Sequence, residues 1–214
     1  MKKSVSVKII ALLLAFTFIF SVSPFSSEAA DEEKDVARVS YMCLVRSPGH
    51  CWIYVENISR NTTLTVGAYE LLPGEGVSVG TFGPTRYDGY GIYYNVEAYC
   101  QTEYGMSGCK TLTEDVTASE LEALSNGILS YKNGWSPFRN CIAFAAKIWN
   151  IVSSKKLSNL IFPAFASIQL FFKGCSTDTV VQKPVTADEV YRQRGSGNNA
   201  YLDSVKKISL GDLS

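Results

Sequence analysis

Between Val36 and Gln101 the sequence consists of short segments rich in valine, isoleucine, threonine and tyrosine, separated by glycine and proline. Ser47-Pro48-Gly49 and Pro73-Gly74 are expected to be turns, because proline presets φ and glycine accepts the left-handed conformation. Short strands with this punctuation favour an antiparallel sheet. The sequence therefore predicts about five strands: Val36–Arg46, His50–Asn57, Thr62–Tyr69, Gly76–Phe82 and Ile92–Gln101.

After Cys109 the pattern changes from strands to helices. Thr117 and Glu120 have the spacing of a capping box, in which the two side chains satisfy free backbone N–H groups at a helix start. Gly127 is expected to end this helix, because glycine readily adopts a left-handed cap. Strands followed by packed helices predict an α+β domain.

A second helix is predicted to contain Cys141 and to end near Val152. The next segment, Leu157–Lys173, is strongly apolar but contains Pro163 and several polar residues. We expect a helix pair or a broken helix that packs on the sheet. A membrane span is the alternative, and the proline and the polar residues argue against it.

The first thirty residues are predicted to be a secretory signal peptide. Three lysines precede the apolar run Ile9–Val22, which is too short to span a bilayer comfortably, and a cleavage point follows at Ala29. An uncleaved N-terminal anchor is the alternative. We therefore expect a secreted or extracytoplasmic protein associated with the cell envelope. Residues 31–214 are long enough for one domain, with a polar C-terminal tail from Val185.

Charge excludes one class of partner. Removing Lys2, Lys3, Lys8 and Glu28 with the signal leaves 17 basic and 19 acidic residues, a formal charge of about −2. No basic stripe remains, so nucleic acid is not an expected partner. We also expect no stable membrane span after signal removal.

Six cysteines lie in the mature part of the chain, and an even count in an oxidising compartment predicts disulfide pairing. Two local pairs are sterically easy, Cys43 with Cys51 and Cys100 with Cys109. Cys141 and one other cysteine, Cys175, would remain and could pair with each other. The sequence contains one histidine and no Cys/His spacing typical of zinc, so no metal and no cofactor are expected.

Cys141 is predicted to lie in the first turn of its helix. Either Ser136-Pro137 or Asn140 can begin this helix. Serine and asparagine are favoured as caps, and proline is favoured at the first helical position. The partial positive charge of a helix start favours a thiolate, and a lowered pKa makes a thiol nucleophilic. The alternative is a buried or disulfide-bonded structural cysteine on an apolar helix face.

His50, the only histidine, begins a predicted strand and shares one face with Trp52 and Tyr54. An imidazole on a strand that faces a helix start is the arrangement that a Cys–His nucleophile needs. The base also needs a polar group to orient it. Asn95 and Glu97 on the predicted strand Ile92–Gln101 are the first candidates, and Tyr54 and Glu56 are the alternatives.

Asn140 can supply an amide near an oxyanion, as can the backbone N–H of Cys141.

Three motifs together carry a family resemblance: GHCWIYVEN (Gly49–Asn57), GIYYNVEAY (Gly91–Tyr99) and NCIAFAAKIWN (Asn140–Asn150). In this order they resemble the circularly permuted branch of the NlpC/P60, papain-like superfamily. The resemblance implies a permuted papain-like fold, a helix-borne thiolate at Cys141, its partner at His50 and a third polar residue on the next core strand. Members of the superfamily cleave amide bonds in cell-wall or other peptides, and some relatives act on lipid acyl groups. The cysteine-rich sheet departs from the family pattern.

Three hypotheses about function follow. The first is an exported cysteine hydrolase that cleaves amide bonds in a cell-wall peptide or another peptide. The second is a secreted, disulfide-stabilised binding module without catalysis, whose aromatic sheet face recognises a sugar or a peptide. The third is a lipid acyltransferase or thioesterase with the same dyad, in which Leu157–Phe172 would help to form an acyl pocket.

Overall fold

The computed structural model describes residues 34–45, 49–83, 90–132, 136, 138–159 and 162–205. All of them belong to one compact unit, Lys34–Ser214. Several predicted features lie outside the described residues: the signal peptide with its cleavage point, the Ser47-Pro48 part of a turn, the capping residue Pro137 and the end of the C-terminal tail.

The main sheet has eight strands in the order β10-β9-β6-β5-β2-β1-β7-β8, and every pair of neighbours is antiparallel. The α+β class is thus confirmed, with a larger sheet than the five strands expected. The strands are β1 (Asp35–Leu44), β2 (His50–Asn57), β5 (Gly76–Phe82), β6 (Gly91–Tyr94), β7 (Cys109–Thr117), β8 (Ser176–Thr177), β9 (Tyr191–Arg194) and β10 (Tyr201–Ser204). A separate two-stranded sheet pairs β3 (Leu64–Val66) with β4 (Tyr69–Leu71).

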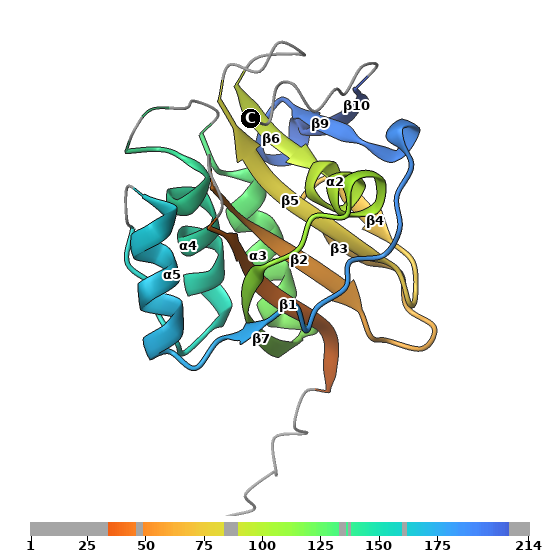
Figure 1. Ribbon diagram of the computed structural model, residues 1–214. Coiled ribbons are helices and arrows are strands. Elements are labelled where there is room, and N and C mark those ends of the chain that lie inside the picture. The colour runs from red at the N-terminus through yellow and green to blue at the C-terminus, as the bar shows by residue number, and fades with distance from the viewer. Residues whose placement is uncertain are drawn as a thin grey trace, which may run out of the picture. The chain divides into compact units, whose positions relative to one another are not determined.

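Four α-helices within the described residues cover both faces of the main sheet (Figure 1). They are α2 (Val96–Tyr104), α3 (Ala118–Leu129), α4 (Cys141–Val152) and α5 (Pro163–Phe172), and two short 3₁₀ turns follow, η1 (Ala187–Glu189) and η2 (Gly197–Asn199). The core between the sheet and α3 and α4 contains Ile53, Val79, Phe144 and Trp149, all fully buried. Helix α2 packs on the other face, where Val96 and Cys100 join a smaller cluster.

Local sequence rules account for most of these elements. Strands β2 and β5 have the predicted bounds, and the capping box at the start of α3 is formed: the Thr117 hydroxyl accepts from the Glu120 N–H, and the Thr117 N–H donates to the Glu120 carboxylate at 3.0 Å. Gly127 does not end α3, because the helix continues to Leu129. A methyl group at Gly127 would overlap the Ile151 side chain, so this glycine allows α3 and α4 to pack closely.

The prediction of a strand over Ile92–Gln101 is wrong, because β6 ends at Tyr94 and α2 begins at Val96. Asn95 between them has a φ of 67°, in the left-handed region that asparagine tolerates better than most residues. Its N–H donates to the Ser78 carbonyl at 2.8 Å, which fixes the chain at the point where it leaves the sheet. The predicted strand Thr62–Tyr69 is likewise divided, into β3 and the start of β4.

The apolar segment after α4 forms one helix, α5, whose first residue is Pro163, a position that proline favours. It packs beside β1 and β7. Among the residues that the structure describes, no helix has the length and apolar character needed to cross a membrane.

Candidate active site

The first side chain of the candidate site is His50, at the start of β2. Its ring stacks on Phe82, with centroids 4.6 Å apart, and on Trp52 at 5.6 Å. The His50 side chain is 19% exposed, so one edge of the ring remains accessible. The predicted alternation along β2 is confirmed, since Trp52 and Tyr54 share a cluster on one face and Cys51 packs into the main core on the other.

Glu97 holds one nitrogen of this imidazole. Its carboxylate is 2% exposed, and Oε1 lies 2.8 Å from His50 Nε2. The other oxygen, Oε2, accepts from the Ser78 hydroxyl at 2.9 Å. The Ser78 oxygen in turn accepts from the Ala98 N–H at 3.3 Å, within the first turn of α2. Both carboxylate oxygens are therefore fixed, and they fix the plane of the ring.

Gly80 provides the space in which this contact is made. A methyl group at this position of β5 would overlap Glu97 Oε1 and would lie 3.1 Å from His50 Nε2. Any larger residue would have to displace the carboxylate from the imidazole. The sequence of β5 thus permits the His50–Glu97 contact by omitting a side chain where the two groups meet.

Cys141 is the first residue of α4, and Asn140 is its N-cap. Asn140 Oδ1 accepts from the Ala143 N–H at 3.0 Å, so the predicted cap by asparagine is confirmed. The thiol interacts with His50 through charge and through a hydrogen bond, and backbone groups of Cys51 and Ile142 also bond to it. Because Glu97 occupies His50 Nε2, Nδ1 is the nitrogen left for the thiol.

The contact shifts the pKa values of both groups. Burial disfavours the Cys141 thiolate, but the charge and hydrogen bond of His50, aided by backbone hydrogen bonds, outweigh it and lower the pKa of the thiol below its ordinary value. Burial likewise disfavours a charged imidazole, yet Cys141 first and then Glu97 raise the pKa of His50 from 6.5 to about 10. Both shifts favour the form of the pair in which Cys141 is a thiolate and His50 an imidazolium.

One predicted site residue, Asn95, has a role other than the one expected. Asn95 does not contact His50: its Oδ1 accepts from the Ser78 N–H at 3.3 Å, and its Nδ2 donates to the Glu189 carbonyl at 3.1 Å, so it joins β5, α2 and η1. Asn140 uses its Oδ1 to cap α4, and its role at an oxyanion stays a prediction. Glu97 reaches His50 from a helix and not from the predicted strand.

All six cysteines are free thiols in the structure, so neither of the two expected local disulfides is formed. Cys43 and Cys51 are buried and lie opposite each other in the register of β1 and β2, but their thiols are not bonded. Cys100 faces the cluster under α2, whereas Cys109 packs with Met42 and Trp52 in a different cluster. Residues 101–104, half of the segment between Cys100 and Cys109, belong to α2, so the chain between them is not a tight turn and the two cysteines diverge.

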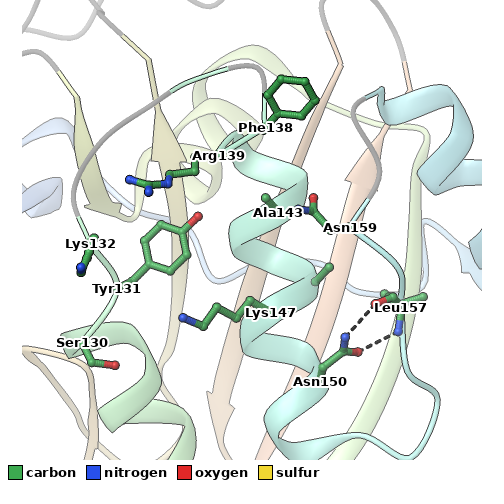
Figure 2. Close-up of a pocket in the computed structure, with 11 residues that line it drawn as sticks. Ser130, Tyr131, Lys132, Phe138, Arg139, Ala143, Lys147, Asn150, Leu157 and Asn159 are labelled. Carbon is green, nitrogen blue, oxygen red and sulfur yellow. Dashed lines mark hydrogen bonds between the residues drawn. The ribbon is translucent and has the colours of Figure 1, made fainter.

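A cavity of about 570 Å³ lies along α4 (Figure 2). Its lining includes Lys132, Arg139 and Lys147, the ring of Tyr131, and Leu157. None of its lining residues among the described part of the chain is acidic. Two lining residues, Arg139 and Ala143, are each two positions from Cys141 in the sequence, so the cavity begins beside the turn that carries the thiol.

The described residues contain no group of three or more histidine, cysteine or acidic side chains placed to hold a metal ion. The candidate site consists of Cys141 from α4, His50 from β2 and Glu97 from α2. Comparison of the chain with known protein families, with curated proteins and with solved structures finds no match.

Three contributors to this site were not identified in the sequence. All three lie on β5. Ser78 donates to the Glu97 carboxylate, Gly80 leaves space for that carboxylate, and Phe82, the last residue of the strand, stacks on His50. The only signal was the pattern of small residues in GVSVGTF, which by itself is also typical of an ordinary strand.

Proposed function

We propose that this protein is a cysteine hydrolase that cleaves amide bonds, with Cys141 as nucleophile, His50 as acid and base, and Glu97 as the group that orients His50. One observation carries the proposal. The Cys141 thiol, at a helix start, interacts with the His50 imidazole, and the buried Glu97 carboxylate lies 2.8 Å from Nε2 of the same ring. A nucleophile, a base and an orienting group in series are the arrangement that nucleophilic catalysis requires.

The reaction would proceed in two stages. The Cys141 thiolate attacks the carbonyl carbon, and as the C–N bond breaks, the His50 imidazolium gives its proton to the departing amine, which leaves a thioester. Water then gives a proton to the neutral His50 and attacks the thioester carbon. The C–S bond breaks, the acid product leaves, and the proton on His50 restores the thiolate–imidazolium pair.

The helix start would also stabilise the transition state. The first N–H groups of α4 have no partners within the helix, and the side chain of Asn140 accepts from that of Ala143. The N–H of Cys141 is therefore a candidate donor to the oxyanion that forms next to the thiol. Because the donors are fixed before the reaction, they stabilise developing charge without reorganisation.

The proposal includes the substrate class and the place of action. The resemblance to permuted NlpC/P60 proteins supports cell-wall or other peptides as substrates, and the apolar run Ile9–Val22 supports export to the cell envelope. The disulfide-stabilised binding module is less well supported, because Cys141 is a free thiol that contacts His50. In the acyl-transfer alternative, Leu157–Phe172 would line an acyl pocket, but five large apolar side chains of Phe162–Phe172 are exposed.

A substrate screen tests the proposal. Residues 30–214 and the Cys141→Ser variant are incubated in parallel with cell-wall fragments, with a peptide mixture and with acyl-ester lipids, and products are identified by mass spectrometry. We expect new amine and carboxyl termini in a peptide arm with the wild type and none with the variant. Turnover of acyl esters alone would favour the acyl-transfer alternative. No turnover in any arm, or equal turnover by Cys141→Ser, would contradict the proposal.

A further inference from the structure

Helix α5 and the residue before it expose most of their large apolar side chains to solvent. Five of them are more than half exposed, with Phe172 at 80%: Phe162, Phe165, Ile168, Phe171 and Phe172. The buried side of the helix is made of Ala166, Ser167 and Leu170. A helix on the surface of a globular protein normally places its large apolar residues against the core, so this arrangement is inverted. An exposed contiguous apolar face of this kind marks an interaction site.

The exposed rings also contact one another along the helix. Phe162 and Phe165 have centroids 6.0 Å apart, and Phe171 and Phe172 are 5.7 Å apart, both pairs edge to face. The face is thus continuous at both ends of α5, which distinguishes it from scattered single exposed residues. We call these five side chains, Phe162, Phe165, Ile168, Phe171 and Phe172, the aromatic face.

The segment of the sequence that contains the aromatic face is basic. Between Ala123 and Thr177 the sequence contains six basic residues and no acidic one, whereas the rest of residues 31–214 contains 11 basic and 19 acidic residues. Lys110, from β7, lies with its Nζ 6.0 Å from the centroid of Phe171, and Lys173 directly follows the helix. Of the six basic residues between Ala123 and Thr177, Lys173 follows the helix and three, Lys132, Arg139 and Lys147, line the cavity along α4 (Figure 2).

We propose that the aromatic face docks this protein on the surface of an anionic lipid bilayer. Phenylalanine and isoleucine on one side of a helix, with basic residues around it, are the composition of helices that lie in the membrane interface. Lysine and arginine close to the surface add attraction to anionic lipids. A helix of ten residues is too short to cross a bilayer, so α5 would lie on it. This inference does not depend on the proposed hydrolase activity.

A second copy of this chain suits the aromatic face less well than lipid does. In a two-fold interface each copy presents the same surface, so the basic segment of one copy would face that of the other. The segment from Ala123 to Thr177 contains no acidic residue to offset that repulsion, and the carboxylate of Asp178, which follows it, is bonded to the Gly108 and Cys109 N–H groups. An anionic bilayer instead offers hydrocarbon to the aromatic face and phosphates to the lysines.

Docking through α5 would bring the candidate active site close to the membrane. A methyl group at Gly49, next to His50, would lie 2.7 Å from Pro163, the first residue of α5. Cys43 Sγ is also 3.8 Å from the Pro163 carbonyl oxygen. The start of α5 is therefore in contact with the segment that carries His50.

Vesicle co-sedimentation tests the inference. Residues 30–214, which include the whole compact unit but not the apolar run Ile9–Val22, are mixed with vesicles of phosphatidylcholine alone or of equal parts phosphatidylcholine and phosphatidylglycerol. We expect binding to the anionic vesicles that weakens with added salt. The Phe171→Ser/Phe172→Ser variant should partition about tenfold or more less strongly, because two exposed rings no longer enter the lipid.

The matched control is Val181→Ser/Tyr201→Ser, which removes two exposed apolar side chains away from α5 and should bind as the wild type does. Circular dichroism checks that each variant is folded. If Phe171→Ser/Phe172→Ser is not folded, Phe165→Ser takes its place in the binding measurement. Failure of the wild type to bind either vesicle, or undiminished binding by the α5 variants, would overturn the inference. A dimer in sedimentation velocity that dissociates in the α5 variants, without vesicle binding, would assign the aromatic face to a second copy and overturn it too.

Discussion

The His50→Ala variant is expected to hydrolyse amide substrates about a thousandfold or more slowly than the wild type. The variant loses both the charge that favours the Cys141 thiolate and the proton that the departing amine requires. The burial that disfavours the thiolate remains, so the thiol would become a poorer nucleophile than a free cysteine. The measurement is kcat/KM on the substrate that the screen identifies.

Glu56→Ala is the matched control for this variant. Glu56 lies on the same strand and is 3.7 Å from Lys183, at the end of β2 away from the thiol. Its loss should leave kcat/KM within a few-fold of the wild-type value, since an exposed ion pair of this kind contributes little. A His50→Ala variant as active as Glu56→Ala would mean that His50 is not the catalytic base.

Replacing Gly80 by alanine should cost about a hundredfold or more in kcat/KM, although residue 80 need not touch substrate. The added methyl group would overlap Glu97 Oε1, which is held by the His50 ring and, through Oε2, by Ser78 on the other side of the carboxylate. Glu97 cannot move without losing its contact with the imidazole. We expect the loss mainly in kcat, because the group that orients the base is displaced.

Gly76→Ala separates this effect from a general loss of stability. Gly76 lies on the same strand, and a methyl group there would overlap the Tyr54 hydroxyl, which accepts from the Lys183 N–H at 3.0 Å. Both variants should lower the free energy of unfolding by roughly 1–3 kcal/mol, as overpacking does. Only Gly80→Ala should also lower kcat/KM strongly. Equal kinetic losses in the two variants would show that Gly80 has no special link to Glu97.

Elements that depend on local rules were predictable from the sequence. The bounds of β2 follow from alternating residues after a turn, and the start of α3 follows from the reciprocal bonds of Thr117 and Glu120. The start of α4 follows from Asn140, whose side chain caps it, so the position of Cys141 in a first turn was also predictable. In each case the residues that decide the conformation are close together in the sequence.

Helix α2 was not predictable in this way, because its start depends on contacts made across the fold. Tyr94, Asn95 and Val96 continue an alternation typical of a strand, and the chain leaves the sheet only where Asn95 adopts a left-handed conformation bonded to β5. A local signal existed in the acidic Glu97 close behind an asparagine, which is typical of a helix start. The β-propensity of the tyrosines before it outweighed that signal.

The dyad was predictable as a pair of residue types, but its surroundings were not. Nothing in the sequence order brings Ser78 and Gly80 to Glu97, since the register of β2, β5 and β6 decides which side chains meet there. Disulfides were expected because the cysteine count is even and the compartment oxidising. That rule does not take into account strand register or the direction of each side chain, and the six cysteines are free thiols. Glu97 was predicted from its position on one face of a strand, but this segment is helix α2, and Glu97 contacts His50 from that helix.

The most direct test of the central claim is peptide-mapped alkylation of Cys141 in the non-reduced protein across a range of pH. In the wild type we expect Cys141 to react as a thiolate below the ordinary pKa of a cysteine, at a rate that stays constant until His50 loses its proton near pH 10. In His50→Ala the apparent pKa should rise, because only the backbone hydrogen bonds then oppose the effect of burial. A Cys141 that titrates in the same way in both proteins, or that is found in a disulfide bond, would contradict the assignment of Cys141 and His50 as a catalytic pair.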